Sequence, residues 1–205
     1  MIVEWAANNR NTEIVKLLVS QLEMPDDTEI KEEKALDISN LRDDLSAEQV
    51  VYILLKKMNE AGRSINKDDA YNYLISVFQN YITVFAGEPG TGKTSLCKLL
   101  AKTLGLYNDR FAEILVERGW TSSKDLIGYY NPLTKEIEET QPAFSKCMKQ
   151  LTRENVENIV KAPYFVLLDE ANLSPIEYYW SHFNFFADDP SKQKITYSDG
   201  TEYFF

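Results

Sequence analysis

The chain has 205 residues and a formal net charge of −10, with 44% hydrophobic and 26% charged residues. These values are ordinary for a globular protein of one or two domains that builds its own core. Residues 1–80 and 81–205 are both acidic, which excludes nucleic-acid binding through bulk positive charge, so no direct nucleic-acid site is evident.

The cysteines and the N-terminus indicate a cytoplasmic protein. Cys97 and Cys147 form no Cys-x-x-Cys pair, and the chain has one His. A structural zinc site is therefore excluded, and we expect buried thiols rather than a disulfide framework. The first residues lack the pattern of a signal peptide, and no apolar run reaches the roughly 18 residues of a membrane helix. We expect no contact with a membrane.

The first part of the chain offers only weak patterns. Residues 1–22 carry apolar side chains at roughly helical spacing and end before Pro25, which predicts a helix. Residues 25–44 are dense in charge and poor in large apolar groups, which is typical of a solvated helix or a linker.

Clearer helical signals follow. Ser46 and Gln49 have the spacing of a capping box, and the apolar face after them runs to a stop at Gly62. A second helix is predicted over 67–79, burying Tyr71, Leu74, Ile75 and Phe78. We interpret residues 1–64 as a helical N-terminal segment or linker without visible chemistry, and 65–205 as the beginning of a nucleotide-binding domain.

The central motif is Gly87–Thr94, which reads G-x-x-x-x-G-K-T between an apolar run at 81–86 and a helical pattern. Strand, loop and helix in this order predict a phosphate-binding loop. Its glycines allow the backbone N–H groups to surround an anion at a helix N-terminus. Lys93 is expected to reach the β- and γ-phosphates as a catalytic cation, and the Thr94 hydroxyl to bind Mg²⁺. The alternative, a chance match, occurs about once per hundred chains of this length. The predicted nucleotide-binding residues are Gly87, Glu88, Pro89, Gly90, Thr91, Gly92, Lys93, Thr94 and Ser95.

The next part of the chain alternates between helical and strand patterns. We predict a helix whose buried face is Leu96, Leu99, Leu100 and Leu104, a strand over 111–116, a short helix from Ser122 or Ser123, a small hairpin with arms 129–130 and 136–138, and a helix from Pro142 to about Arg153. Surface packing is the simplest role for Tyr129 and Tyr130.

A second chemical motif follows the apolar run at 163–168, which is typical of a strand buried on both faces. The run ends in Asp169 and Glu170. Carboxylates at the C-terminal end of such a strand lie in the crevice where α/β proteins bind ligands. We expect Asp169 to hold the Mg²⁺ shell and Glu170 to act as the catalytic group that polarises the attacking water. An acidic turn without function is the alternative, but the phosphate loop upstream favours the catalytic interpretation.

The last segment is predicted to contain a helix and a hairpin. Ser174 and Pro175 are expected to begin one helix that continues through Phe186, with His182 as a packing or surface residue. Asp199-Gly200 lies between β-rich arms at 194–197 and 202–205, a strong hairpin signal. The chain stops within an apolar strand, from which we expect it to be part of a longer protein.

Three of these segments resemble a known family. GEPGTGKTSL at 87–96, GWTSSKDLIGYYNP at 119–132 and LLDEANLSP at 167–175 are similar to the AAA+ ATPases of the McrB, MoxR and dynein-related branch, and most similar to the McrB-like members. The first and third motifs are the Walker A and Walker B motifs common to AAA+ proteins, whereas the middle one is more specific. The resemblance covers about residues 65–205.

The resemblance implies an α/β fold, the αβα parallel sheet of a P-loop NTPase with strand order 5-1-4-3-2. It implies that the hairpin at 129–138 interrupts the second helix and faces the pore of a hexamer, and that Asn172 has a role near the acidic pair. A sensor strand, an arginine finger and a helical lid would follow in the family. None follows residue 205, so we expect a domain truncated after the Walker B region and weak activity of this piece alone.

We expect ATP binding and Mg²⁺-dependent hydrolysis by part of an AAA+ motor that remodels protein or nucleic acid. A McrB-like defence system is one setting, in which the full-length protein forms a homo-oligomeric ring with or without a partner subunit. GTP is the alternative nucleotide, because McrB itself prefers GTP. A slow nucleotide-dependent switch or scaffold is a second hypothesis for the function, and an interaction module centred on residues 1–64 is a third.

Overall fold

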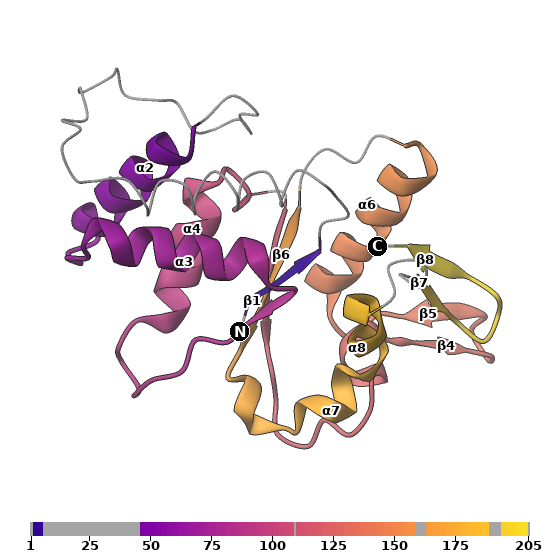
Figure 1. Ribbon diagram of the computed structural model, residues 1–205. Helices are drawn as coiled ribbons and strands as arrows, with labels where there is room; N and C mark the ends of the chain where they lie inside the picture. The colour runs from indigo at the N-terminus through magenta and orange to yellow at the C-terminus, as the bar shows by residue number, and fades with distance from the viewer. Residues whose placement is uncertain (1, 6–45, 109, 159–162, 189–193, 205) are drawn as a thin grey trace. The chain divides into compact units, whose positions relative to one another are not determined.

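The computed structural model describes residues 2–5, 46–108, 110–158, 163–188 and 194–204. The chain divides into two compact units, which we describe separately (Figure 1): one comprises Met1–Ala7 and Arg110–Phe205, and the other comprises Asn8–Asp109. Of the predicted helix over 1–22, Ile2–Trp5 is instead a strand, β1. The rest of that prediction and the prediction for 25–44 lie outside the described residues. The expected boundary at residue 64 stays a prediction.

The described part of the unit Asn8–Asp109 consists mainly of three helices and the predicted phosphate loop. Helix α2 spans Ala47–Glu60 and begins with the predicted capping box. The Ser46 hydroxyl accepts from Gln49 N at 3.3 Å, and Gln49 Oε1 accepts from Ser46 N at 2.8 Å. Two backbone donors of the first turn are thereby satisfied, which fixes where the helix starts.

Helix α3 spans Lys67–Gln79, the predicted bounds, with Asn66 as N-cap. Tyr71, Leu74 and Phe78 are buried as predicted, whereas Ile75 is half-buried and Val77 takes the core position. The prediction for Ile75 was wrong because the buried face of α3 consists of Ala70, Tyr71, Leu74, Val77 and Phe78. Helix α2 packs against both α3 and α4.

Strand β2 covers only Ile82–Thr83, so the predicted strand at 81–86 is too long. Val84 is 69% exposed, which shows that burial of the apolar run ends at Thr83. The Thr83 hydroxyl donates to Ser76 O of α3 at 2.7 Å and ties the start of the loop to that helix. Helix α4 then spans Lys93–Thr103; Leu96 and Leu100 are buried as predicted, while Leu99 and Leu104 are half-buried.

The other unit is built on strand β6, Tyr164–Asp169, whose residues are buried from Tyr164 to Leu168. Strand β3, Phe111–Leu115, pairs with it in parallel, with Leu115 opposite Asp169. Strand β1 pairs antiparallel along β6 from Ile2 opposite Leu167 to Trp5 opposite Tyr164. The sheet of this unit is therefore mixed, and the parallel pair β3–β6 is the part that the sequence predicted.

Helix α6, Pro142–Val156, lies beside the sheet and contacts β3 and β8 (Figure 1). It runs three residues beyond the predicted end at Arg153. An ion pair fastens its last turns to the start of β3: Arg110 Nη2 lies 2.6 Å from Glu154 Oε1, with 12% and 6% of the two side chains exposed. Gln150 and the Tyr164 hydroxyl donate to the same oxygen at 3.0 and 3.3 Å.

Both predicted hairpins are present. Strands β4, Tyr129–Asn131, and β5, Glu136–Glu138, pair with Tyr129 opposite Glu138. Strands β7, Lys194–Thr196, and β8, Glu202–Phe204, flank the turn containing Asp199 and Gly200. The short helix α5, Lys124–Ile127, precedes the first hairpin, with Ser123 at its N-cap position.

The segment after β6 differs from its prediction. Instead of one helix through Phe186, a 3-10 turn η1, Ala171–Leu173, is followed by α7, Ile176–Tyr179, and α8, Ser181–Asp188. The helical conformation is interrupted at Trp180, between α7 and α8. This side chain is 1% exposed and packs against Phe183 at a centroid distance of 4.3 Å. Burial of this large side chain sets the break, which local spacing does not reveal.

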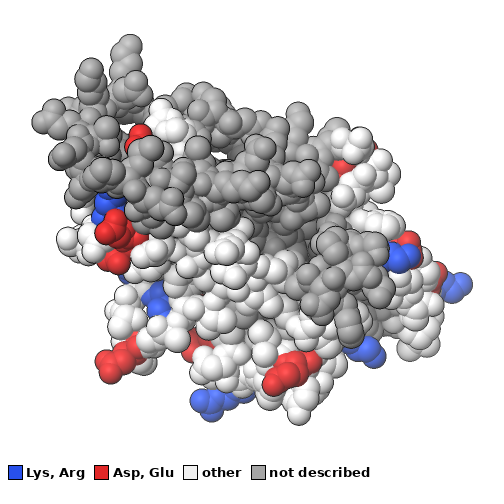
Figure 2. Space-filling view, in the orientation of Figure 1, with Lys and Arg blue, Asp and Glu red and all other residues white. Residues whose placement is uncertain are grey.

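The surface and the thiols agree with the composition. Cys97 and Cys147 are free and buried, as predicted. Acidic and basic side chains are interspersed on the visible face in Figure 2. In the described part of the chain, no helix combines the length and apolarity that crossing a membrane requires.

Candidate nucleotide-binding site

The predicted phosphate loop is an exposed segment that leads from β2 into α4. Residues 86–91 are exposed, and Gly90 and Gly92 both have φ of 81°. This left-handed conformation favours glycine. Gly92 is the N-cap of α4, so the loop delivers its last glycines to the start of an eleven-residue helix.

Lys93 turns its side chain back over the loop. Its Nζ donates to Gly87 O and to Glu88 O, both at 2.9 Å. The Thr91 hydroxyl and the Thr91 N–H donate to Glu88 O at 2.8 and 3.4 Å, so that this one carbonyl receives three donors. The ammonium group is thereby held over the mouth of the loop by exposed carbonyl groups, which water or an anion can replace at small cost.

The N-terminus of α4 has neither a side-chain cap nor an acidic residue in its first turn. The two preceding helices have both: α2 has Ser46 and Glu48, and α3 has Asn66, Asp68 and Asp69. Backbone N–H groups of a first turn lack intrahelical acceptors and carry the positive end of the helix dipole. At α4 this positive end is complemented by no carboxylate of its own first turn, as in helices that bind phosphate.

Thr94 and Ser95 lie in the first turn of α4, Thr94 half-buried and Ser95 exposed. A hydroxyl at this position fits a Mg²⁺ ion, which prefers oxygen ligands. In phosphate-binding sites this ion keeps several waters and takes its remaining ligands from one or two protein oxygens and the phosphates. The described residues contain no cluster of three or more His, Cys, Asp or Glu side chains that could hold a metal.

The acidic pair lies in the other unit, at the C-terminal end of β6. Asp169 is half-buried, and its Oδ1 accepts from Glu170 N at 3.1 Å. Glu170 is exposed and has φ of 51°, a conformation that costs energy for a residue with a side chain. The turn η1 follows, with Leu173 N donating to Glu170 O at 2.9 Å. The strand end thus presents two carboxylates of different exposure.

Asn172 is exposed within η1, and Ser174 closes the segment. The buried Ser174 hydroxyl accepts from Gly119 N and Trp120 N, both at 3.1 Å, and donates to Glu117 O at 2.8 Å. The sequence interpretation treated Ser174 as a helix cap and missed this role. Three bonds across more than fifty positions cannot be recognised from local spacing.

The middle motif is folded around its own aspartate. Asp125 Oδ2 accepts from Thr121 N at 2.8 Å and from Ser122 N at 2.9 Å, an arrangement that shapes the turn before α5. Trp120 is 7% exposed and meets Tyr179 edge to face at 5.2 Å. The motif is therefore packed against the segment that follows the acidic pair.

The hairpin β4–β5 ends in an exposed tip, where Leu133 is 91% exposed, while Tyr129 at the base of the hairpin is 40% exposed. Its base is tight, because a Cβ on Gly128, whose φ is 79°, would overlap the carbonyl oxygen of Glu138. Surface exposure of Tyr129 agrees with its simplest role.

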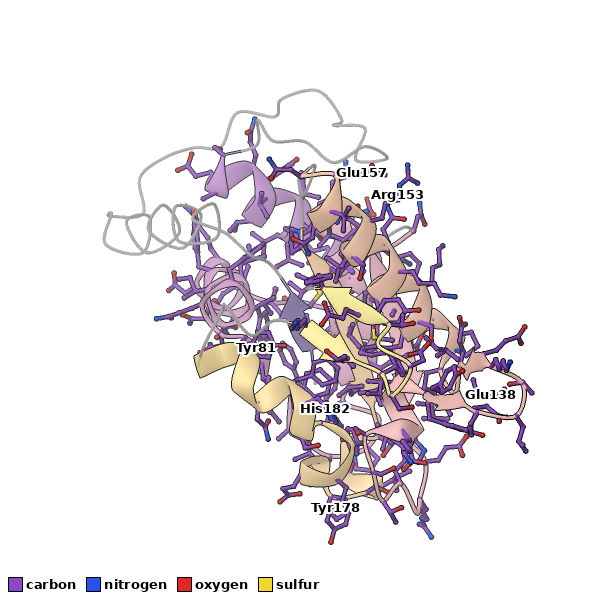
Figure 3. All side chains as sticks on the ribbon, turned by 90° about the vertical axis from the view of Figure 1, so that its right-hand side faces the viewer. Tyr81, Glu138, Arg153, Glu157, Tyr178 and His182 are labelled. Carbon is purple, nitrogen blue, oxygen red and sulfur yellow. The ribbon has the colours of Figure 1, made fainter. Side chains whose placement is uncertain are left out.

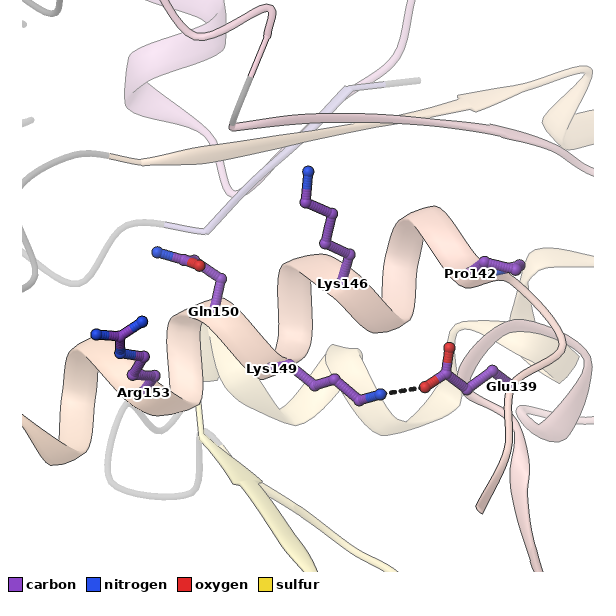
Figure 4. A pocket seen from close by; sticks show the side chains of 6 residues that line it. All are labelled: Glu139, Pro142, Lys146, Lys149, Gln150 and Arg153. Carbon is purple, nitrogen blue, oxygen red and sulfur yellow. Dashed lines mark hydrogen bonds and ion pairs between the residues drawn. The ribbon is translucent and has the colours of Figure 1, made fainter. Parts of the chain in front are cut away.

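A separate hollow of about 340 Å³ lies along α6, lined by Glu139, Pro142, Lys146, Lys149, Gln150 and Arg153 (Figure 4). Lys149 is paired with Glu139, and this bond raises the pKa of Lys149. Arg153 is paired with Glu157 at 2.9 Å near the C-terminal end of the helix (Figure 3). Most of the cations here have partners, and none of the predicted site residues lines this hollow.

His182, labelled in Figure 3, lies on α8 with an exposed side chain. Desolvation by the surrounding protein lowers its pKa. Among the described residues it joins no group of metal-ligating side chains, and its surface position agrees with the prediction.

Comparison with protein-family models matches residues 75–191 to the model described as AAA domain. The match covers more than half of the chain and includes both the loop and the acidic pair. The comparisons with curated proteins and with solved structures gave no match.

Proposed function

The chain belongs to the AAA domain family, and from this premise we propose that it binds ATP with Mg²⁺ and hydrolyses it. Nucleotide binding is the general property of the family. Our proposal adds the nucleotide, the metal, the reaction and the residues that act.

The N-terminus of α4 carries the proposal for binding. Lys93 and the uncapped first turn offer a cation and backbone N–H donors at one place. We propose that the triphosphate binds in the loop Gly87–Ser95. Its oxygens then accept the hydrogen bonds that the Lys93 ammonium otherwise donates to the carbonyls of Gly87 and Glu88. In this arrangement the β- and γ-phosphates satisfy the donors that the helix does not satisfy itself.

The acidic pair supports the proposal for hydrolysis. Water attacks the γ-phosphorus in line; the new P–O bond forms as the bond to the β–γ bridging oxygen breaks, giving ADP and phosphate. Glu170, exposed at the strand end, orients this water and receives its proton. Bound Mg²⁺ neutralises charge on the phosphates, and we assign Thr94 and Asp169 to its coordination shell. These roles rest on the two motifs and on the geometry of each motif within its own unit.

Binding is tested with fluorescent ATP and GTP analogues in the presence of Mg²⁺, comparing the wild type with Lys93→Ala. We expect saturable binding that the variant loses. We expect the ATP analogue to be preferred, as is usual for the AAA+ branch that the chain resembles. The Asn-Lys-x-Asp sequence at Asn66–Asp69 starts helix α3, where the Asn66 side chain caps the helix by accepting from Asp69 N at 2.7 Å. Preference for the GTP analogue would replace ATP by the McrB-type nucleotide. Equal binding by both proteins would contradict the assignment of the loop.

Hydrolysis is tested with Glu170→Gln by phosphate release over a range of protein concentrations. We expect the variant to bind the ATP analogue normally but to turn over at least about 100-fold more slowly than the wild type. Unchanged turnover would remove Glu170 from the mechanism. Slow turnover by the wild type at every concentration would favour the nucleotide-dependent switch or scaffold.

We further propose that the chain acts within a ring-shaped motor that remodels protein or nucleic acid, as the McrB-like resemblance implies. The exposed Leu133 at the tip of β4–β5 supports a contact role for this hairpin. Analytical ultracentrifugation with a non-hydrolysable ATP analogue tests assembly. A Leu133→Ser variant that assembles normally but has lost stimulation by substrate would support the assignment of the hairpin.

A further inference from the structure

A second cation lies beside the phosphate loop. Arg63, between α2 and α3, is distant in sequence from the motif, but its guanidinium occupies the space next to Gly92. A Cβ added to Gly92 would overlap Nη2 and Cζ of Arg63 and would lie 2.9 Å from Nη1. Both residues belong to the same compact unit.

The backbone of Arg63 is fixed by the end of α2. Gly62 has φ of 72°, Gly62 N donates to Asn59 O at 2.9 Å, and Arg63 N donates to Met58 O at 2.8 Å. These two bonds form a Schellman motif, which satisfies the last carbonyls of the helix. Arg63 therefore leaves α2 in a defined direction, and its side chain starts from a rigid point.

Gly92 admits this approach because it has no side chain. Its φ of 81° alone favours glycine, and the contact with Arg63 adds a second reason. The guanidinium consequently lies at the N-cap of α4, where the first turn contains no acidic residue.

This position is electrostatically unfavourable without an anion. The N-terminus of a helix carries partial positive charge, and Lys93 adds a full charge in the next position. Among the described residues, no hydrogen bond or ion pair engages the Arg63 guanidinium, although it offers five donors. Structural arginines are normally paired, as Arg110 is with Glu154 at 2.6 Å. An arginine held against a positive helix end lacks what a phosphate group supplies.

We propose that Arg63 is a further phosphate-binding residue of the nucleotide site, contributed by the α2–α3 connection and acting on the triphosphate together with Lys93. The proposal rests on the proposed function of the loop. It extends the site to a residue outside the sequence motif and predicts that residues before the motif take part in binding.

The test measures binding of a fluorescent ATP analogue with Mg²⁺ to Arg63→Ala, Arg63→Lys and Lys56→Ala. Lys56 is the matched control, an exposed cation on α2. We expect Arg63→Ala to lower the affinity about tenfold or more, since charged hydrogen bonds to phosphate are strong. Arg63→Lys, which keeps the charge without the planar fork, is expected to recover part of the affinity. Lys56→Ala is expected to bind as the wild type does.

A second readout separates binding from structure. Without nucleotide, the Tm of Arg63→Ala is expected to equal or exceed that of the wild type, because a repelled charge is removed. The increase in Tm on addition of Mg-ATP is expected to shrink. A fall in the nucleotide-free Tm with unchanged affinity would show a structural arginine and overturn the proposal.

Lys93→Ala distinguishes the two levels of inference. If Lys93→Ala loses binding while Arg63→Ala binds as the wild type does, the loop functions as proposed and the assignment of Arg63 is wrong. If Lys93→Ala also binds normally, the proposed function itself fails, and the assignment of Arg63 fails with it.

Discussion

Arg110 and Arg63 show two ways of placing an arginine. In the unit built on β6, the Arg110 side chain is 12% exposed and paired with Glu154, whose Oε1 also accepts from Gln150 and Tyr164. In the helical unit, Arg63 lies against the N-cap of α4 with its guanidinium unpaired among the described side chains. The paired charge of Arg110 stabilises its own unit, whereas we propose that the charge of Arg63 serves a phosphate ligand.

The helix starts repeat this contrast within one unit. Helix α2 closes its first turn with Ser46 and Gln49 and places Glu48 near the positive end. Helix α4 has no side-chain cap and begins with Lys93. The same physics of unsatisfied N–H groups therefore stabilises α2 and underlies the binding site that we propose at α4.

Removing a paired charge is expected to have the largest effect. Arg110→Ala leaves the buried Glu154 carboxylate without its cation, so we expect the free energy of unfolding to fall by about 3 kcal/mol. Urea denaturation measures this change. Arg153→Ala is the matched control, since its pair with Glu157 is solvent-exposed and is worth at most about 0.5 kcal/mol. Equal losses of unfolding free energy in the two variants would show that the buried ion pair stabilises the fold no more than the exposed pair does.

Removing the positive charge of the loop is expected to affect binding rather than folding. Lys93→Ala should lower the affinity for Mg-ATP by about 100-fold, measured by fluorescence titration. Lys102→Ala is the control on the same helix, because Lys102 is exposed in the last turn and lies 4.6 Å from the ring centroid of Tyr107. Similar affinities for the two variants would show that position in the helix is unimportant.

The contrast between helix starts can be reversed by substitution. Ser95→Glu gives α4 the acidic first turn that α2 and α3 have, and we expect a gain of about 0.5 kcal/mol in unfolding free energy. The same carboxylate repels phosphate, so the affinity for Mg-ATP should fall about tenfold. Ser95→Gln controls for side-chain size and is expected to bind more tightly than Ser95→Glu. A glutamate that leaves binding unchanged would place the phosphates away from this turn.

The opposite substitution is made at α2. Ser46→Ala removes the cap and should lower the unfolding free energy by about 1 kcal/mol, with no change in the affinity for Mg-ATP. Thermal denaturation and the same titration measure the two effects. Ser46→Thr retains an acceptor and serves as the control; if it were as destabilising as alanine, the hydroxyl bond would not be the stabilising feature.

The smallest expected effect concerns Cys147, near the paired charge. Burial raises the pKa of this thiol to about 12. An unfolded thiol ionises near its ordinary pKa of 9.0, so the unfolded chain loses protons first as pH rises. The contribution of Cys147 to stability is therefore complete below that value and declines above it. We expect slow alkylation by iodoacetamide at about pH 8.5 in the native protein and rapid alkylation in urea. Rapid native alkylation would show that the region is open.

Local signals in the sequence predicted much of this fold. The capping box at Ser46, the bounds of α3, the buried run of β6 and the turn at Asp199-Gly200 all depend on neighbouring residues. The phosphate loop and the acidic pair were likewise recognised as motifs, and the family match includes both. Their assigned roles remain proposals.

What the sequence did not predict depends on distant contacts. Strand β1 exists because β6 offers an edge for pairing, and the break at Trp180 exists because that side chain is buried. The approach of Arg63 to Gly92 requires α2 to pack beside α4. None of these contacts leaves a periodic pattern in the chain, so spacing alone cannot reveal them.

The hydroxyl of Ser174 has a mechanical consequence. It forms hydrogen bonds with Gly119 N, Trp120 N and Glu117 O at once. These bonds connect the segment after the acidic pair to the segment before α5. If one of these segments moves, either the other moves with it or the three hydrogen bonds of Ser174 break. If Glu170 acts in hydrolysis as we propose, a displacement of the segment that follows it would reach the segment before α5 through the side chain of Ser174.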